Sequence, residues 1–180
     1  MTSIDTSRRV RRLFSSTTVA IVFFGCITYA VPGLADGTKS LGRAGEWGAF
    51  VSAQKADKVC YAASKPKHSQ DAPPHRGDVY FSVADRPTDK SDGVVSVTAG
   101  YTYKADALAE VDVDGVKFSL YTAQNTAWSQ QNKALVQAML KGKTMLVYGT
   151  PAKGRQIVDT YSLDGFAKTF AEIAHACVTK

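Results

Sequence analysis

Residues 143–177, KTMLVYGTPAKGRQIVDTYSLDGFAKTFAEIAHAC, decide the fold of this 180-residue chain. Residues 144–150 and 156–162 are rich in aliphatic, β-branched and aromatic side chains, which favour strands. Pro151 and Gly154 lie between these two runs, and proline and glycine are the residues that most often turn a chain. The order strand, turn, strand predicts an antiparallel β-hairpin.

The second half of the same stretch predicts an amphipathic helix. Its apolar side chains recur at the 3.6-residue period of a helix and form one stripe: Phe166, Phe170, Ile173, Ala174 and Cys177. The charged side chains of this segment lie off the stripe, so one face of the helix should pack and the other should face water. We expect Gly165, where the chain leaves the hairpin, to allow a close approach to another segment.

The N-terminus predicts export from the cell. Four arginines between residues 8 and 12 precede an apolar run at residues 19–30, and the small-residue sequence Gly33-Leu34-Ala35 follows. This order is typical of a signal peptide, so we predict a signal peptide at residues 1–35 and cleavage after Ala35. The run is shorter than the roughly 20 residues that span a bilayer, which favours cleavage over the alternative of an uncleaved anchor. We expect no transmembrane segment in the mature chain.

The rest of the chain has the length of one domain. Residues 36–46 are small, polar and rich in glycine and predict a flexible lead-in, followed by a single domain at residues 47–180. The whole chain has 22 basic and 16 acidic residues, but residues 36–180 retain 18 and 15, so most of the excess positive charge lies in the signal segment. The remaining basic residues are scattered among acidic ones, which argues against a nucleic-acid partner.

Two cysteines remain after removal of the signal segment, Cys60 and Cys177. An even number of cysteines in an exported protein favours a disulfide, and two cysteines allow a single intramolecular pairing. The alternatives are two free thiols or an intermolecular bridge. If Cys60 and Cys177 pair, the helix stripe that ends in Cys177 also holds the helix to the strand that contains Cys60.

Turn signals divide the domain into about eight short strands. Strand patterns occur at residues 47–52, 59–64, 79–84 and 94–101, and the Asp114-Gly115 turn joins two more. A short helix is predicted at residues 132–141, with Gly142 as its C-terminal cap. Because strands and helices do not alternate, we predict a mainly β domain, a β-sandwich or flattened barrel with two short helices near the C-terminus.

No motif for catalysis or for metal binding is present in the sequence. The three histidines, His68, His75 and His175, lack the spacing of zinc ligands relative to one another and to the cysteines. The serines lie in no nucleophile motif, and the carboxylates lie scattered on predicted turns. We therefore predict no catalytic residues, no metal site, no cofactor and no enzymatic activity.

The two tryptophans are the only candidate ligand-binding residues. Trp47 and Trp128 could stack on a ligand beside the polar loop at residues 65–78, which contains three of the six prolines. The alternative is that each tryptophan packs in the core or covers it, as single tryptophans beside strands commonly do.

A series of short motifs across the domain resembles a known family. They are Trp47-Gly48, VCYAASKP at residues 59–66, RGDVYF at 76–81, VVSVTAGY at 94–101, DTYSLDGF at 159–166, and Cys177. Together they resemble the invasion-associated locus B family of exported bacterial proteins. One difference is the absence of the further cysteine that many members have shortly after the tryptophan, where this chain has Ala49-Phe50-Val51, so a second disulfide is not expected.

The resemblance implies a β-rich protein in the periplasm or at the outer membrane or cell surface of a Gram-negative bacterium. It implies no established catalytic residues. We expect the chain to act through a binding surface, with a protein, an envelope component or a host-cell surface component as its partner, and with a contribution to host-cell invasion in pathogenic members. The alternative is a periplasmic small-ligand binding protein.

Overall fold

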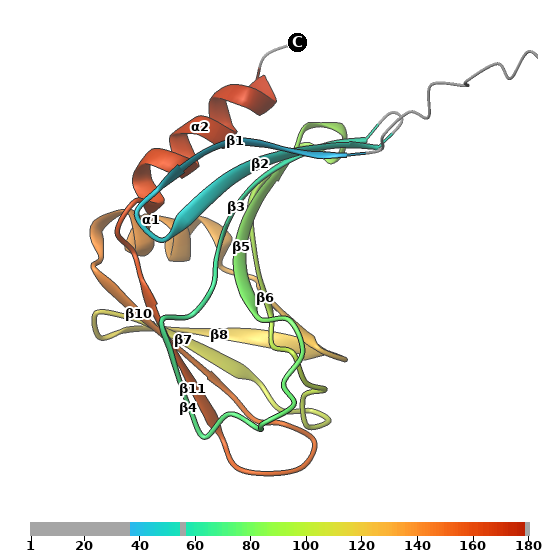
Figure 1. Ribbon diagram of the computed structural model, residues 1–180, viewed down its shortest axis with the longest axis vertical. Coiled ribbons are helices and arrows are strands. Elements are labelled where there is room, and N and C mark those ends of the chain that lie inside the picture. Colours follow the sequence, from blue (N-terminus) through green and yellow to red (C-terminus); the bar gives the residue numbers. More distant parts are fainter. Residues whose placement is uncertain (1–36, 55–56, 179–180) are drawn as a thin grey trace, which may run out of the picture. The chain divides into compact units, whose positions relative to one another are not determined.

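The computed structural model describes residues 37–54 and 57–178. In this part of the chain, strands with alternating side chains form one antiparallel sheet (Figure 1). The strands are β1 (Thr38–Ala44), β2 (Trp47–Gln54), β3 (Asp57–Ser64), β4 (His68–Gln70), β5 (Tyr80–Arg86), β6 (Ser91–Thr98), β7 (Ala109–Val113), β8 (Val116–Ala123), β9 (Thr126–Ser129), β10 (Thr144–Gly149) and β11 (Ile157–Ser162). The helices are the 3₁₀-helix η1 (Pro87–Asp89), α1 (Asn132–Lys141) and α2 (Phe166–Val178). The predicted signal peptide lies outside the described residues.

The order of the strands in the sheet is β1-β2-β3-β5-β6-β9-β8-β7-β10-β11-β4. All ten neighbouring pairs are antiparallel, and β1 and β4 are the two edges of the sheet. The prediction of a mainly β domain with two helices near the C-terminus is confirmed. The prediction of about eight strands is too low, because the described residues form eleven strands in one open sheet.

The three strands that the sequence did not indicate are β1, β4 and β9. Residues 36–46 were expected to be a flexible lead-in, but residues 38–44 pair with β2 as an edge strand with an irregularity between Ser40 and Gly42. Strand β4 lies in the polar loop and pairs with β11, and β9 includes Trp128. These strands are short or exposed. They form because their backbones pair with a neighbouring strand, and not because their side chains alternate in hydrophobicity.

The sheet folds over so that strands far apart in its order share one core. The Phe81 ring on β5 lies 5.9 Å from the Tyr161 ring on β11, in an edge-to-face arrangement. The indole of Trp47 on β2 donates a hydrogen bond of 2.9 Å to the Ser162 carbonyl at the end of β11. The side chains of Trp47, Phe81 and Tyr161 are wholly buried, so the core lies between these two parts of the sheet.

Helix α2 covers the core face of β1, β2, β3 and β5 (Figure 1). The predicted stripe is confirmed: Phe166 and Ile173 are fully buried, and the Phe166 ring lies 4.8 Å from the Trp47 ring. Gly165 has a φ of 87°, and a Cβ atom there would overlap the Ala44 carbonyl oxygen. Only glycine allows the chain to enter α2 so close to the β1–β2 turn.

The helix of residues 132–141 and both hairpins also agree with the sequence. Asp114 and Gly115, in the β7–β8 turn, have positive φ values of 48° and 94°, as a type I′ turn requires. None of the helices among residues 37–54 and 57–178 is long and apolar enough to cross a membrane.

Candidate functional site: a groove on the outer face of the sheet

A groove of about 920 Å³ lies on the outer face of the sheet, opposite the core face that α2 covers. Because side chains alternate along a strand, the residues between the core residues of β2, β3, β5 and β6 all point to this face. One row of aligned residues crosses six neighbouring strands: Gly48, Ala63, Ser82, Ser96, Trp128 and Tyr121. The first four of these residues are small and form the floor of the groove.

Aromatic side chains stand on both sides of this floor. Phe50 on β2 and Tyr61 on β3 are stacked with ring centroids 5.2 Å apart. Trp128 on β9 and Tyr121 on β8 are stacked at 5.6 Å, and strand order places Tyr121 on the side away from the floor. Tyr80 is 40% exposed and also lines the groove. We use the name outer-face groove for this floor with its aromatic sides.

Small residues explain the shape of the groove. At the β2 end of the floor the Phe50 ring lies over Gly48, since a Cβ atom on Gly48 would lie 2.7 Å from two atoms of that ring. The hydroxyl groups of Ser82 and Ser96 lie 2.8 Å apart and hydrogen-bond to each other across β5 and β6. A run of small residues on one face of four strands therefore leaves a hollow between two aromatic pairs.

Charged residues of both signs also line the outer-face groove. They are Arg43, Glu46, Asp57, Lys65 and Arg86. Glu46 forms an ion pair of 3.3 Å with Lys67, and both side chains are about half exposed. The mixture of signs argues against a site for a highly charged ligand.

The two tryptophans have different positions. Trp128 is half-buried and lines the outer-face groove, together with Lys65 and Pro66 from the start of the loop at residues 65–78. Trp47 has no exposed surface and lies in the core, so it contributes nothing to a ligand-binding surface, and the core alternative holds for it. The sequence did not indicate Phe50, Tyr61 or Tyr80 as site residues, although strand alternation places all three opposite core residues.

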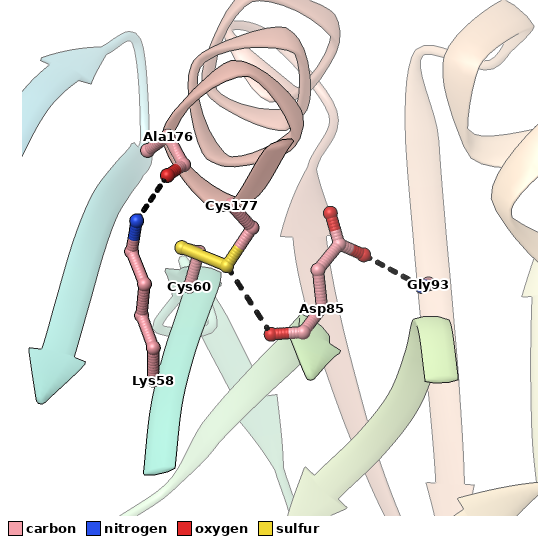
Figure 2. The surroundings of a disulfide bond; sticks show 6 residues. All are labelled: Lys58, Cys60, Asp85, Gly93, Ala176 and Cys177. Carbon is pink, nitrogen blue, oxygen red and sulfur yellow. Dashed lines mark hydrogen bonds between the residues drawn. A yellow bond between two sulfur atoms is a disulfide. The ribbon is translucent and has the colours of Figure 1, made fainter. Parts of the chain in front are cut away.

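The Cys60–Cys177 disulfide joins β3 to the last turn of α2 (Figure 2). This confirms the predicted pairing, with the two Cα atoms 5.9 Å apart. The Lys58 ammonium group donates a hydrogen bond of 2.6 Å to the Ala176 carbonyl, where a positive charge also complements the C-terminal end of the helix dipole. The Cys177 sulfur lies 3.6 Å from the Asp85 carbonyl oxygen, so the disulfide lies close to β5 as well as to β3.

Asp85, whose backbone carbonyl faces the Cys177 sulfur, has a buried carboxyl group that points toward Gly93 (Figure 2). The residue is 6% exposed, and its carboxyl group accepts a hydrogen bond of 2.7 Å from the Gly93 amide. Burial raises the pKa of Asp85 above the ordinary value of 3.8, the Gly93 hydrogen bond opposes this rise, and the nearby charge of Asp92 adds to it. The charged form of Asp85 is therefore disfavoured in the folded protein.

The Asp85→Asn variant should change how stability depends on pH. Because the folded-state pKa is raised, the stabilising contribution of Asp85 is complete below the unfolded pKa and is lost as pH rises through the folded pKa. Asparagine retains an acceptor for the Gly93 amide and does not ionise. The stability of the variant relative to the native protein should therefore increase from acidic to neutral pH, as measured by urea unfolding across that range. A difference that does not vary with pH would contradict this.

A buried ion pair joins the loop at residues 65–78 to β11. Arg76 donates two hydrogen bonds of 2.7 Å to the two carboxylate oxygens of Asp159, and the side chains are only 8% and 4% exposed. Arg76 Nε also donates to the Ala99 carbonyl, and the Ser69 hydroxyl donates to Asp159. The guanidinium group lies 5.1 Å from the Tyr101 ring centroid. These contacts satisfy both charges, so the pair is a structural element of the fold.

The environment of this ion pair changes the pKa values of the groups around it. Burial opposes the charge on Arg76, but the hydrogen bond and charge of Asp159 hold the pKa of Arg76 above its ordinary value. Burial raises the pKa of Tyr101 to about 12, an effect that the Arg76 charge reduces. The pKa of Tyr161 is also raised by burial. These tyrosines therefore remain neutral at physiological pH.

The three histidines lie on separate parts of the fold. His68, His75 and His175 are exposed and lie on β4, in the following loop and on α2. Among residues 37–54 and 57–178, no group of three or more His, Cys, Asp or Glu side chains is arranged to hold a metal ion.

Comparison with known proteins identifies relatives of this chain. A family model described as "Invasion associated locus B (IalB) protein" matches residues 47–174. The chain is also similar to the crystal structure of invasion associated protein b from Bartonella henselae, with a TM-score of 0.54 and 18% sequence identity over 77% of this chain and 96% of that chain. At this identity the likeness concerns the fold. No curated protein matches the chain.

Proposed function

Since the chain belongs to the invasion-associated locus B family, we propose that it is an exported protein that acts by binding a component of the bacterial envelope or of a host-cell surface. The outer-face groove is the binding surface. The observation that carries this proposal is the groove itself, a hollow of about 920 Å³ between two stacked aromatic pairs. Aromatic side chains with accessible surface are typical of binding sites, because they offer a large contact area at a small entropic cost.

The chemistry of the floor supports binding. Gly48 and Ala63 carry no reactive group. An activated serine nucleophile needs a hydrogen bond to an adjacent general base, but the Ser82 and Ser96 hydroxyls hydrogen-bond to each other. The charged groups of the groove belong to residues outside the floor row, where they could contribute to partner selection.

The disulfide supports an exported location. A disulfide such as Cys60–Cys177 forms and persists in oxidising compartments, among them the bacterial periplasm and the cell surface. The predicted signal peptide at residues 1–35 supports the same route. We place the protein in the periplasm or on the outer surface of a Gram-negative envelope, where the groove would meet an envelope component or a host cell.

The Trp128→Ala variant tests the proposed function. The purified, oxidised protein is immobilised and incubated at physiological salt with an extract of bacterial envelopes and, separately, of host-cell membranes. We expect saturable retention of a component from at least one extract. Retention should fall at least about tenfold in the variant, because a stacking contact and its buried area are lost.

The Tyr148→Ala variant is the matched control. Tyr148 is a half-buried aromatic residue of β10 that does not line the groove, and Lys117 approaches its ring at 5.7 Å. This variant should retain the component as the native protein does. Absence of saturable retention from both extracts, or equal retention by native and Trp128→Ala proteins, would reject the groove as the binding surface.

A second candidate function is the binding of a small ligand in the periplasm. The groove volume lies within the range of ordinary small-molecule sites, and Trp128 lines it. In the same experiment, this function predicts that the retained component is a small molecule, released when the immobilised protein is denatured. Retention of a macromolecule supports the first proposal instead.

A further inference from the structure

A second hollow extends the outer-face groove along the sheet. It has a volume of about 820 Å³, and the residues that line it include Asp78, Tyr80, Thr98, Thr102 and Gln124. Tyr80 and Thr98 line both hollows, so the two adjoin where β5 begins and β6 ends. A ligand that fills both would be an extended chain and not a single compact molecule.

The backbone beneath the groove is not available for peptide binding by strand addition. The floor residues lie on β2, β3, β5 and β6, and each of these strands has a neighbour on both sides. A peptide that binds by adding a strand needs an exposed sheet edge, and the edges here are β1 and β4. Recognition in the groove therefore depends on side chains alone.

The charges around the two hollows balance. Arg43, Lys65 and Arg86 are the basic residues that line them, and Glu46, Asp57 and Asp78 are the acidic ones. A site for a polyanion, such as a nucleic acid or a sulfated polymer, has an excess of basic residues. The balance favours a ligand without net charge.

The remaining side chains present ring faces and hydrogen-bonding groups side by side. Tyr80, which is 40% exposed, and Trp128 offer aromatic faces, and Ser96, Thr98 and Thr102 offer hydroxyl groups. Exposed Asp78 and Gln124 offer a carboxylate and an amide in the second hollow. A sugar complements both kinds of group. Its ring has an apolar C–H face that stacks on aromatic residues, and its edge has hydroxyl groups that form hydrogen bonds.

We propose that the outer-face groove and the adjoining hollow bind a neutral oligosaccharide. The proposal rests on the proposed function, because it names the chemistry of the component that the groove retains. Sugar rings stack on Trp128 and Tyr80, and their hydroxyl groups bond to the serine, threonine, Asp78 and Gln124 side chains. The junction at Tyr80 and Thr98 lets one chain of sugars cross from the first hollow to the second.

Isothermal titration with defined tetrasaccharides tests this inference. The probes are chitotetraose, cellotetraose, maltotetraose and mannotetraose, each titrated into the purified oxidised protein, with the corresponding monosaccharides for comparison. We expect at least one tetrasaccharide to bind saturably, and to bind at least about tenfold more tightly than its monosaccharide, because only the chain reaches both hollows. Trp128→Ala should weaken this binding at least about tenfold, and Tyr148→Ala should leave it unchanged.

The Ala63→Phe variant provides a second readout that does not depend on losing an aromatic contact. Ala63 lies on the groove floor, so a phenylalanine there should obstruct the floor and abolish binding while the core face of β3 is unchanged. Thermal unfolding of each variant confirms that it is folded. Binding that survives in both Trp128→Ala and Ala63→Phe would overturn the groove as the sugar site.

Two further probes separate this inference from the proposed function. A hyaluronan tetrasaccharide tests an acidic glycan, and periodate or protease treatment of the extracts tests whether the retained component depends on sugar or on protein. If no neutral tetrasaccharide binds, or if groove-dependent retention survives periodate and is lost after protease, the oligosaccharide inference fails and the proposed binding function stands. Saturable retention that disappears after periodate from one extract identifies the envelope or the host surface as the source of the sugar.

Discussion

Reduction of the Cys60–Cys177 disulfide should lower the free energy of unfolding by about 4–5 kcal/mol, because the bond closes a loop with a sequence separation of 117 residues. In the chain-entropy model, the disulfide restricts the conformations that the unfolded chain can adopt, so the oxidised protein gains less conformational entropy on unfolding. This effect grows with loop length. Small domains are stable by only about 5–15 kcal/mol, so this loss is a large part of the total. Guanidinium unfolding with and without a reductant measures the change.

The predicted loss of stability also includes a local effect, because the disulfide holds α2 in place. It connects the C-terminal turn of α2 to β3, and α2 covers Trp47 through Phe166. The Cys60→Ser/Cys177→Ser variant should match the reduced protein and should not respond to reductant. Equal unfolding midpoints for the oxidised and reduced native protein would contradict a structural role for the bond. Labelling of thiols in unfolded, unreduced protein should find neither cysteine free.

Asp159→Ala should destabilise the protein by about 3–5 kcal/mol, because it leaves the Arg76 charge buried without its partner. Arg76 is held by two hydrogen bonds from its guanidinium group to Asp159, and the pair connects the loop at residues 65–78 to β11. Urea unfolding at neutral pH gives the free energy. A change below about 1 kcal/mol would contradict the assignment of a buried ion pair.

A surface pair with the same N–O distance, but with a single hydrogen bond, is the control. Lys117 and Glu110 are also 2.7 Å apart, but their side chains are 59% and 39% exposed. Glu110→Ala should therefore lower the free energy of unfolding far less than Asp159→Ala does, since water already solvates both charges. The Arg76→Met/Asp159→Leu variant should recover much of the stability that Asp159→Ala loses, because it removes both buried charges together.

The elements that could be predicted are those whose side chains bury a regular face. The α2 stripe, the helix at residues 132–141 and the two hairpins follow from local periodicity and from turn residues such as Gly115. Strand β1 could not be predicted, because it is an edge strand whose side chains are mostly exposed and carry no hydrophobic alternation. Strand β4 is three residues long and exists only because β11 lies beside it.

The candidate site could be predicted only in part. Trp47 and Trp128 are both predicted as ligand-stacking residues. Trp128 lines the groove, whereas Trp47 has no exposed surface and packs against Phe166 of α2. Alternation places Ala63 and Ser82 on the outer faces of their own strands. It does not show that β2, β3, β5 and β6 align these residues in one row with Trp128.

The amino-acid sequence is enough to predict the mainly β class, the closing hairpin and helix at residues 143–177, and the two cysteines available for a bond. Each of these depends on spacing within a short segment or on a count. The strand order, the burial of Arg76 against Asp159 and the position of the outer-face groove are known only from the folded chain. These features depend on which distant strands pair and in which register. Contacts across the whole domain together favour that pairing, so no short segment determines it.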